Sequence, residues 1–243
     1  MKLQSLPVVA LILFTFGIAP AYAAKDLDNI GALNQSEFKI LSQDLGYALS
    51  YKSASTAEPL GILGLDVGLS LSSTDLQHLD IWQTATSSSD VPGTLLLPKL
   101  QIQKGLPAGF DIGAFYTSVP DTNITLFGGE LSYAFLEEGV VAPALAVRGS
   151  YSRMSGVDEL DLDTTGIELA ISKGLKIFTP YAGIGRVWAD SAPAASTGLA
   201  SENLQLNKYF LGTNISLMLF NLSIEIDETD DVTSYNGRLG IRF

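Results

Sequence analysis

Residues 235–243 read YNGRLGIRF, and they alternate between two chemical classes along their whole length. Every second position holds an aromatic, aliphatic or small residue: Tyr235, Gly237, Leu239, Ile241 and Phe243. The positions between them include Arg238 and Arg242. Successive side chains of a β-strand point to opposite faces, so this pattern predicts a strand between two different solvents. Soluble domains more often end in a loosely held tail.

The same alternation recurs through most of the chain. In residues 61–73, Leu65, Val67 and Leu69 share one face, and Asp66 and Ser70 lie on the other. We predict ten strands in all, at residues 61–73, 95–104, 109–118, 124–136, 142–153, 162–173, 179–189, 204–219, 221–228 and 233–243. One strand departs from the rule, because Tyr181 and Trp188 have opposite parity and cannot share an apolar face without a bulge.

The connections alternate in length, and aromatic residues mark both strand ends. Short links fall near 105–108, 137–141, 174–178 and 219–221, whereas 74–94, 119–123, 154–161, 190–203 and 228–232 are polar and mostly longer. Aromatic residues lie at the short-turn ends (Phe110, Phe135, Phe220, Phe243) and at the long-loop ends (Tyr116, Phe127, Tyr151, Tyr209, Tyr235). Membrane barrels have short periplasmic turns, longer outer loops and two aromatic girdles. The predicted fold is therefore all-β: a transmembrane antiparallel up-and-down β-barrel of about ten strands.

The amino terminus has the layout of a secretory signal peptide. Lys2 precedes an apolar run at 6–19, and Ala21-Tyr22-Ala23 is a small-x-small cleavage site. We therefore predict a signal peptide at residues 1–23 and export of the remaining chain. The sequence contains no cysteine, so disulfides cannot stabilise the exported protein.

Composition excludes one class of partner. Apolar residues make up 47% of the chain, charged residues 16%, and the formal net charge is −12. Such an acidic chain repels phosphate backbones, so no nucleic-acid partner is expected.

A β-sandwich is the alternative fold, because its strands also alternate. An inner face rich in glycine, serine and charge would make a poor sandwich core.

The signal peptide, the alternating strands, PYAGIG at 180–185 and the terminal Tyr-x-Gly-x-Leu-x-Ile-x-Phe together resemble small Gram-negative outer-membrane β-barrel proteins. The resemblance covers nearly all of the chain beyond about residue 60, so 61–243 is the expected transmembrane barrel in the outer membrane. It also implies that the barrel-assembly machinery recognises Tyr235, Leu239, Ile241 and Phe243.

Residues 24–60 do not follow the strand pattern. In SEFKILSQDLGYALSYK (36–52), Phe38, Leu41 and Leu45 have near-helical spacing, with Ser36 as a plausible N-cap, but Leu45, Tyr47 and Leu49 also fit a strand. An eleventh strand would place the amino terminus outside the cell. Parity therefore favours a short helix, and we predict a periplasmic or lumen-capping segment.

The inner face of the predicted barrel carries charges of both signs: Asp66, Lys99, Asp111, Glu130, Arg148, Glu168, Arg186, Lys208, Glu225, Arg238 and Arg242. Ten strands are too few for a wide aqueous channel. An unpartnered buried ion costs several kcal/mol, so these charges are expected to pair. The result would be a plugged barrel or a very narrow pore.

Candidates for chemistry are few. The single histidine, His78, lies in a polar loop with serines and aspartates, and a lipid hydrolase or deacylase would need such groups. The acidic clusters DELDLD (158–163) and DETDD (227–231) could bridge divalent cations to lipopolysaccharide phosphates, but they lack the EF-hand pattern and are typical of a solvated rim. No cofactor and no dedicated metal site are predicted.

The predicted function is that of a non-enzymatic envelope protein, structural or surface-interacting, whose partners are outer-membrane lipids, lipopolysaccharide and the assembly machinery. Two alternatives stay open. One is a narrow channel for small solutes, and the other is a lipid-modifying enzyme of the outer leaflet that uses His78.

Overall fold

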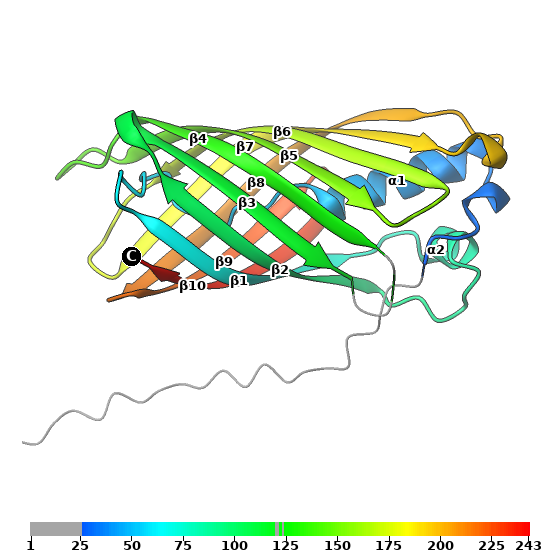
Figure 1. The fold of residues 1–243 in the computed structure, drawn as a ribbon, viewed down its shortest axis with the longest axis horizontal. Helices are drawn as coiled ribbons and strands as arrows, with labels where there is room; N and C mark the ends of the chain where they lie inside the picture. Colours follow the sequence, from blue (N-terminus) through cyan, green and yellow to red (C-terminus); the bar gives the residue numbers. More distant parts are fainter. Residues whose placement is uncertain (1–25, 120–121, 123) are drawn as a thin grey trace, which may run out of the picture.

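The computed structural model describes residues 26–119, 122 and 124–243, so the predicted signal peptide lies outside the described part. Within this part, ten antiparallel strands form one closed barrel (Figure 1). The strands are β1 (Leu65–Asp75), β2 (Thr94–Gly105), β3 (Phe110–Ser118), β4 (Thr125–Leu136), β5 (Ala144–Ser155), β6 (Leu160–Ser172), β7 (Phe178–Pro193), β8 (Glu202–Leu217), β9 (Phe220–Thr229) and β10 (Val232–Arg242). The predicted fold class is confirmed.

The barrel closes where the first and last strands meet. β1 pairs with β10 from Asp66 opposite Arg242 to Thr74 opposite Ser234. Beyond the last strand pair, the Leu65 amide donates to the Phe243 carbonyl at 3.0 Å and the Phe243 amide donates back at 2.8 Å. The backbone of Phe243 therefore extends the seam by one residue pair beyond the ladder of β1 and β10. A closed sheet leaves no edge groups unpaired, which is the condition for crossing hydrocarbon with strands.

The outer face of the barrel is apolar, with aromatic rings near both ends. Leu69 and Leu211 are 67% and 65% exposed, and Phe243 is 65% exposed. At the short-turn end Phe110 is half-buried because it stacks on Tyr133, with 4.6 Å between ring centroids. The aromatic residues predicted for the long-loop end are all exposed on the outside: Tyr116, Phe127, Tyr151, Tyr209 and Tyr235.

The conflict within β7 is resolved without a bulge. The register of β7 against both of its neighbours is continuous, Tyr181 faces inward with 2% exposure, and Trp188 faces outward with 38% exposure. Arg186 has the same parity as Trp188 and is exposed on the outer face. The prediction that Arg186 lies in the lumen is therefore wrong. It requires Tyr181 to face outward, whereas Tyr181 faces inward.

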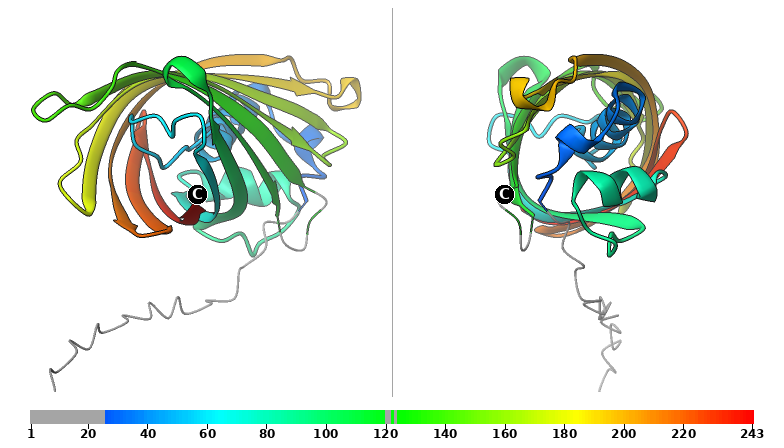
Figure 2. Two further views of the ribbon diagram at one scale, coloured as in Figure 1. Left: turned by 60° about the vertical axis from the view of Figure 1, so that its left-hand side comes forward. Right: turned by 90° about the vertical axis from the view of Figure 1, so that its right-hand side faces the viewer.

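The helix predicted near 36–52 is present as α1 (Gln35–Leu49), and it lies inside the barrel (Figure 2). Its N-cap is Asn34, and the prediction of Ser36 is wrong. The Asn34 Oδ1 accepts hydrogen bonds from the Ser36 and Glu37 amides at 3.0 and 3.1 Å, and Glu37 Oε2 accepts from the Asn34 amide at 2.9 Å. This reciprocal capping box satisfies free amides that a serine already inside the first turn could not reach.

The segment before β1 passes through the barrel from one mouth to the other. At the long-loop mouth, η1 (Ile30–Ala32) contacts α2 (Leu79–Ala85) and η3 (Ala195–Thr197). From there α1 runs into the lumen, and residues 50–60 continue to the short-turn mouth, where the Leu60 amide reaches Asp111. A turn at 61–64 then leads into β1, which begins four residues later than predicted.

This path differs from the sequence-based expectation, which places residues 24–60 in the periplasm or at one mouth. The number of strands alone sets the end of the barrel at which that expectation places residue 60. A segment that crosses inside the lumen changes the end at which the chain lies without adding a strand.

No helix among the described residues is long and apolar enough to span a membrane.

The occupied lumen as candidate functional site

The long-loop half of the lumen is an apolar core built around α1. Phe38, Leu41 and Leu45 of the helix are 0–2% exposed. They belong to one cluster with inward residues of the wall, among them Leu95, Leu97, Leu126, Met154 and Leu162. An enclosed space of about 20 Å³ remains between helix and wall, room for about one water molecule.

This apolar core corrects the expectation of a polar inner face. That expectation holds only for the short-turn half of the barrel. Near the loops the inner positions of several strands are leucines, because α1 supplies the apolar surface against which they pack. Burial of apolar area on both sides stabilises the helix in the lumen.

Most of the predicted charges lie in the lumen, from its middle to the short-turn mouth. Eight are buried: Asp66, Lys99, Glu130, Arg148, Glu168, Lys208, Glu225 and Arg238. Asp111 and Arg242 are half-buried and line the short-turn mouth. Only Arg186 of the predicted set lies elsewhere.

Asp66 is the centre of an ion cluster beneath the seam. Its Oδ1 pairs with Arg238 Nη2, and its Oδ2 accepts from Arg242 Nε at 2.9 Å and from Asn221 Nδ2 at 3.0 Å. Arg238 Nη1 in turn donates to Asn221 Oδ1 at 2.9 Å. The cluster joins β1, β9 and β10, so it links the two strands that close the barrel.

The wall also captures the backbone of the threaded segment. Lys208 Nζ donates to the Tyr51 carbonyl at 2.9 Å, and Gln101 Nε2 donates to the Lys52 carbonyl at 3.1 Å. Further along, Arg148 Nη2 donates to two successive carbonyls, Ser55 at 2.9 Å and Thr56 at 2.5 Å. Carbonyl groups that left water on entering the lumen are thus paired with cations and amides, which avoids the cost of leaving them unsatisfied.

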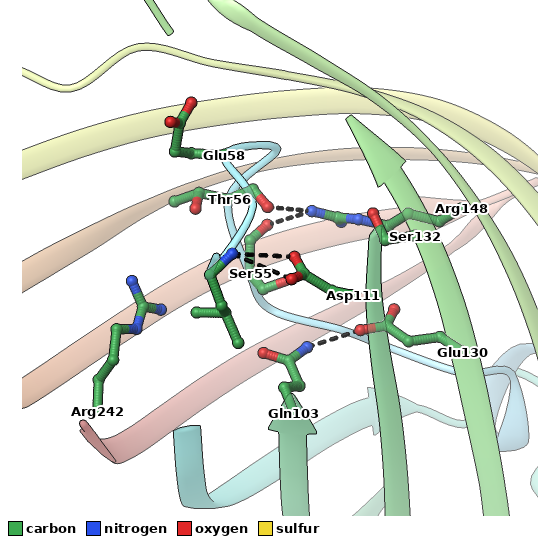
Figure 3. Close-up of a pocket in the computed structure, with 10 residues that line it drawn as sticks. Ser55, Thr56, Glu58, Gln103, Asp111, Glu130, Ser132, Arg148 and Arg242 are labelled. Carbon is green, nitrogen blue, oxygen red and sulfur yellow. Dashed lines mark hydrogen bonds between the residues drawn. The ribbon is translucent and has the colours of Figure 1, made fainter. Parts of the chain in front are cut away.

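A polar cavity lies at the short-turn mouth (Figure 3). Asp111 accepts from the Leu60 amide with both oxygens, at 3.0 and 3.2 Å, and Glu130 Oε1 accepts from Gln103 Nε2 at 2.6 Å. The cavity measures about 10 Å³, room for about one water. At its rim, burial raises the pKa of Glu58, although the Glu138 amide donates to this carboxylate at 2.8 Å.

The predicted set lacks a buried ion pair of the lumen. Lys52 follows the helix and lies 3.7 Å from Asp227, and both side chains are almost fully buried. Asp227 belongs to DETDD, a segment predicted as a whole to form a solvated rim, but it is buried and accepts from Asn236 Nδ2 at 2.7 Å. Its equal parity with Glu225 is the signal that could have placed it inward.

His78 contacts α1. Its Nδ1 lies 3.2 Å from Asp44 Oδ1, and Asp44 Oδ2 accepts from Trp82 Nε1 at 2.9 Å. An aspartate is thus within reach of the histidine, as an enzyme would need. Yet no hydroxyl side chain of the described residues bonds to the His78 ring, so this contact ties the β1–β2 loop to α1 without a nucleophile.

The acidic segments differ in their surroundings. Asp161 and Asp163 lie on the outer face near Arg153, at 3.6 and 3.8 Å. Among the described residues no group of three or more histidine, aspartate or glutamate side chains is placed to hold a metal ion.

No protein-family model matches the chain, and no curated protein matches it in sequence. Several solved barrels are similar in fold. The N-terminal β-barrel domain of Pseudomonas aeruginosa OprF is 11% identical, with 75% of this chain and 99% of that chain covered and a TM-score of 0.38. The KdgM porin is 11% identical over 74% and 99%, with a TM-score of 0.36. The translocator domain of the autotransporter NalP from Neisseria meningitidis is 10% identical over 84% and 93%, with a TM-score of 0.39. Similarities this low carry no information about the ligand or activity of the chain.

Proposed function

We propose that this chain is an integral outer-membrane protein of the Gram-negative envelope, non-enzymatic and structural or surface-interacting, whose barrel is plugged by its own residues 26–64. One observation carries the proposal. The apolar, aromatic-belted outer face of a closed barrel surrounds a lumen that the chain itself fills. A barrel with this exterior is suited to contact the hydrocarbon of a membrane. Because the plug fills the lumen, there is no continuous water path along which solutes could pass.

The proposed orientation follows from loop length. In outer-membrane barrels the short turns face the periplasm and the longer loops face outward. With that orientation, residues 26–34, α2 and η3 lie together at the cell surface, and Phe243 lies at the periplasmic end. The threaded segment and the long loops would form one composite outer surface, which is where a partner would bind.

The alternatives have less support. A narrow channel would need a continuous polar path, but α1 and the apolar wall fill the long-loop half. An enzyme would need a nucleophile beside His78.

The proposed partners are outer-membrane lipids and lipopolysaccharide, together with the assembly machinery. For this machinery the proposed signal consists of Tyr235, Leu239, Ile241 and Phe243.

Single cysteines test this topology without interference, because the chain has none of its own. We expect a membrane-impermeant maleimide to label Asp28→Cys and Ser89→Cys in intact cells, since both positions lie at the long-loop mouth and are accessible to solvent. Val140→Cys, in a short turn, should be labelled only after lysis, and the buried Gln101→Cys should resist labelling in the folded protein.

Conductance separates the plugged barrel from the channel. The refolded protein in a planar bilayer should show no steady single-channel current. Recovery of the chain in a detergent-free soluble fraction, or labelling of Val140→Cys in intact cells, would contradict the proposed location or orientation.

A further inference from the structure

The outer face of the barrel carries an unusual cation. Of the five arginines in the chain, Arg148, Arg238 and Arg242 face the lumen, and Arg153 and Arg186 face outward. Arg153 lies near two carboxylates, Asp161 and Asp163. Arg186 has no carboxylate within ion-pair distance among the described residues.

The partners of Arg186 are neutral amides from β8. Its Nη2 donates to Asn207 Oδ1 at 3.3 Å. With the Gln205 amide in its hydrogen-bonding orientation, the Gln205 oxygen accepts from Arg186 Nε at 3.2 Å and from Nη1 at 3.0 Å. These contacts orient the guanidinium without neutralising it. The planar fork is therefore held on the outer face with its charge uncompensated.

A groove adjoins this cation. It has a volume of about 480 Å³ and runs across β5 to β8. Its lining comprises Val147, Ile167, Leu169, Ile184, Trp188 and Tyr209, together with Glu168, Gly185, Arg186 and Asn207. The Glu168 carboxylate faces the lumen, where it accepts from Lys208 Nζ at 2.7 Å. By strand register Arg186 lies opposite Ile167 on one side and Asn207 on the other. Trp188 follows two residues later on the same face, and Tyr209 is opposite Ile184. Along β7 the cation thus lies between Trp188 and Ile184, among the aromatic residues nearer the long-loop end, and the apolar groove extends from it toward the short-turn end.

We propose that this groove binds a phosphorylated glycolipid of the outer leaflet, with a phosphate on Arg186 and an acyl chain between Ile167, Leu169 and Ile184. The site rests on the proposed membrane location. At the level of the girdle a bilayer presents its head groups, and a guanidinium forms short, charge-assisted bonds with a phosphate. An acyl chain matches the aliphatic lining below. The acidic character of the chain makes one uncompensated arginine a selective place for an anionic lipid.

The test uses native mass spectrometry of the detergent-solubilised full chain, titrated with bisphosphorylated lipid A, with the same lipid after removal of both phosphates, and with inorganic phosphate. Arg186→Gln removes the charge and keeps an amide. Arg153→Gln is the matched control, because it removes the other outward arginine. We expect Arg186→Gln to weaken lipid A binding by about tenfold or more, the effect of losing charged hydrogen bonds, and Arg153→Gln to leave it within about twofold.

The titrations with dephosphorylated lipid and with inorganic phosphate show which part of the lipid is bound. The dephosphorylated lipid should bind the wild-type protein as weakly as lipid A binds the Arg186→Gln variant, and inorganic phosphate alone should give no saturable adduct. Equal affinities of the two arginine variants, or equal binding of lipid with and without phosphate, would overturn the site. Insertion of both variants into lipid vesicles, seen as an altered gel mobility without heating, is measured in parallel. If both insert and only the binding result fails, the lipid site is wrong and the membrane barrel stands.

Discussion

Two aromatic rings show how single residues shape the inner wall. Tyr181 lies over Gly212 of the neighbouring strand, and Phe210 lies over Gly183, with the two ring centroids 6.4 Å apart. Each ring occupies the space that a side chain on the facing glycine would need. Glycine at these positions therefore permits an aromatic residue on the adjacent strand to lie flat against the sheet.

Gly183→Ala should destabilise the barrel. A Cβ at this position would overlap the Phe210 ring and lie 2.6 Å from the Leu169 carbonyl oxygen. We expect a loss of roughly 1–3 kcal/mol in the free energy of unfolding, the usual cost of overpacking, measured by urea titration in lipid vesicles. Gly237→Ala is the control, because no atom of the described residues lies within 4 Å of the place its new methyl group would take. Equal effects at both positions would show that the ring does not depend on the glycine.

Asp66→Asn should be more costly than the loss of a surface carboxylate. The substitution keeps the shape of the side chain but leaves the buried Arg238 without its counter-ion. Breaking a buried pair from one side costs roughly 3–5 kcal/mol. Asp163→Asn, which acts on the exposed Arg153 contact, should cost at most about 1 kcal/mol. The comparison uses the same vesicle titration, and similar values for the two variants would argue against a structural role for the ion cluster at the seam.

At the scale of elements, α1 is the feature that distinguishes this barrel from an empty one. From Leu41 to Leu49 all of its residues except Gln43 are buried, because the wall and the loops enclose this part of the helix. Three separate attachments hold it: the hydrogen bonds of Gln35 with the Ala200 backbone and Glu202 at its start, the Asp44 contacts with His78 and Trp82, and the Lys208 contact with the Tyr51 carbonyl that follows it. A helix with so many attachments is expected to remain in the lumen.

Engineered cysteines can test the position of the helix. A Cβ at Gly46 would lie 3.0 Å from the Ala189 Cβ, close enough for a disulfide after a small adjustment. We expect Gly46→Cys with Ala189→Cys to cross-link on oxidation in isolated membranes, seen as a mobility shift on non-reducing gels. Gly46→Cys with Ala182→Cys is the control, because Ala182 has outward parity on β7. Cross-linking of the control pair, or of neither pair, would contradict a helix inside the barrel.

At the scale of the whole molecule, the outer face must match the membrane. Leu169→Arg should cost roughly 2–4 kcal/mol if this residue lies near the bilayer midplane, whereas Thr165→Arg, four residues nearer the long-loop end of β6, should cost only about 0–1 kcal/mol. Both positions are exposed on the same strand, so the pair isolates depth. Folding titrations into lipid vesicles measure the difference, and equal costs would place the hydrocarbon elsewhere.

Phe243 addresses assembly of the whole molecule. Phe243→Ala keeps the backbone bonds to Leu65 and removes a ring that is 65% exposed. We expect it to lower the amount of barrel in the outer membrane of cells while refolding in vitro matches that of Phe220→Ala, an exposed phenylalanine at the same end. If both variants reach the outer membrane equally well, Phe243 is not a signal for the assembly machinery.

The alternation of side chains was enough to determine the wall of this barrel. Period-2 patterns place residues on faces locally, so the ten strands, their order and the pairing of β1 with β10 were predictable. The parity of one strand was not, because β7 has an aromatic residue on each face. The side on which Arg186 lies could therefore not be read from the pattern.

The contents of the lumen were decided only by the tertiary structure. Alternation shows that two faces differ, but it does not say what meets the inner face. Residues 26–64 enter at one mouth and leave at the other, so apolar inner residues pack on α1 and charged ones bind the carbonyls of residues 51–56. Those contacts join residues up to 157 positions apart. Short-range periodicity carries no record of such distant partners, and this is why the wall was predictable and its plug was not.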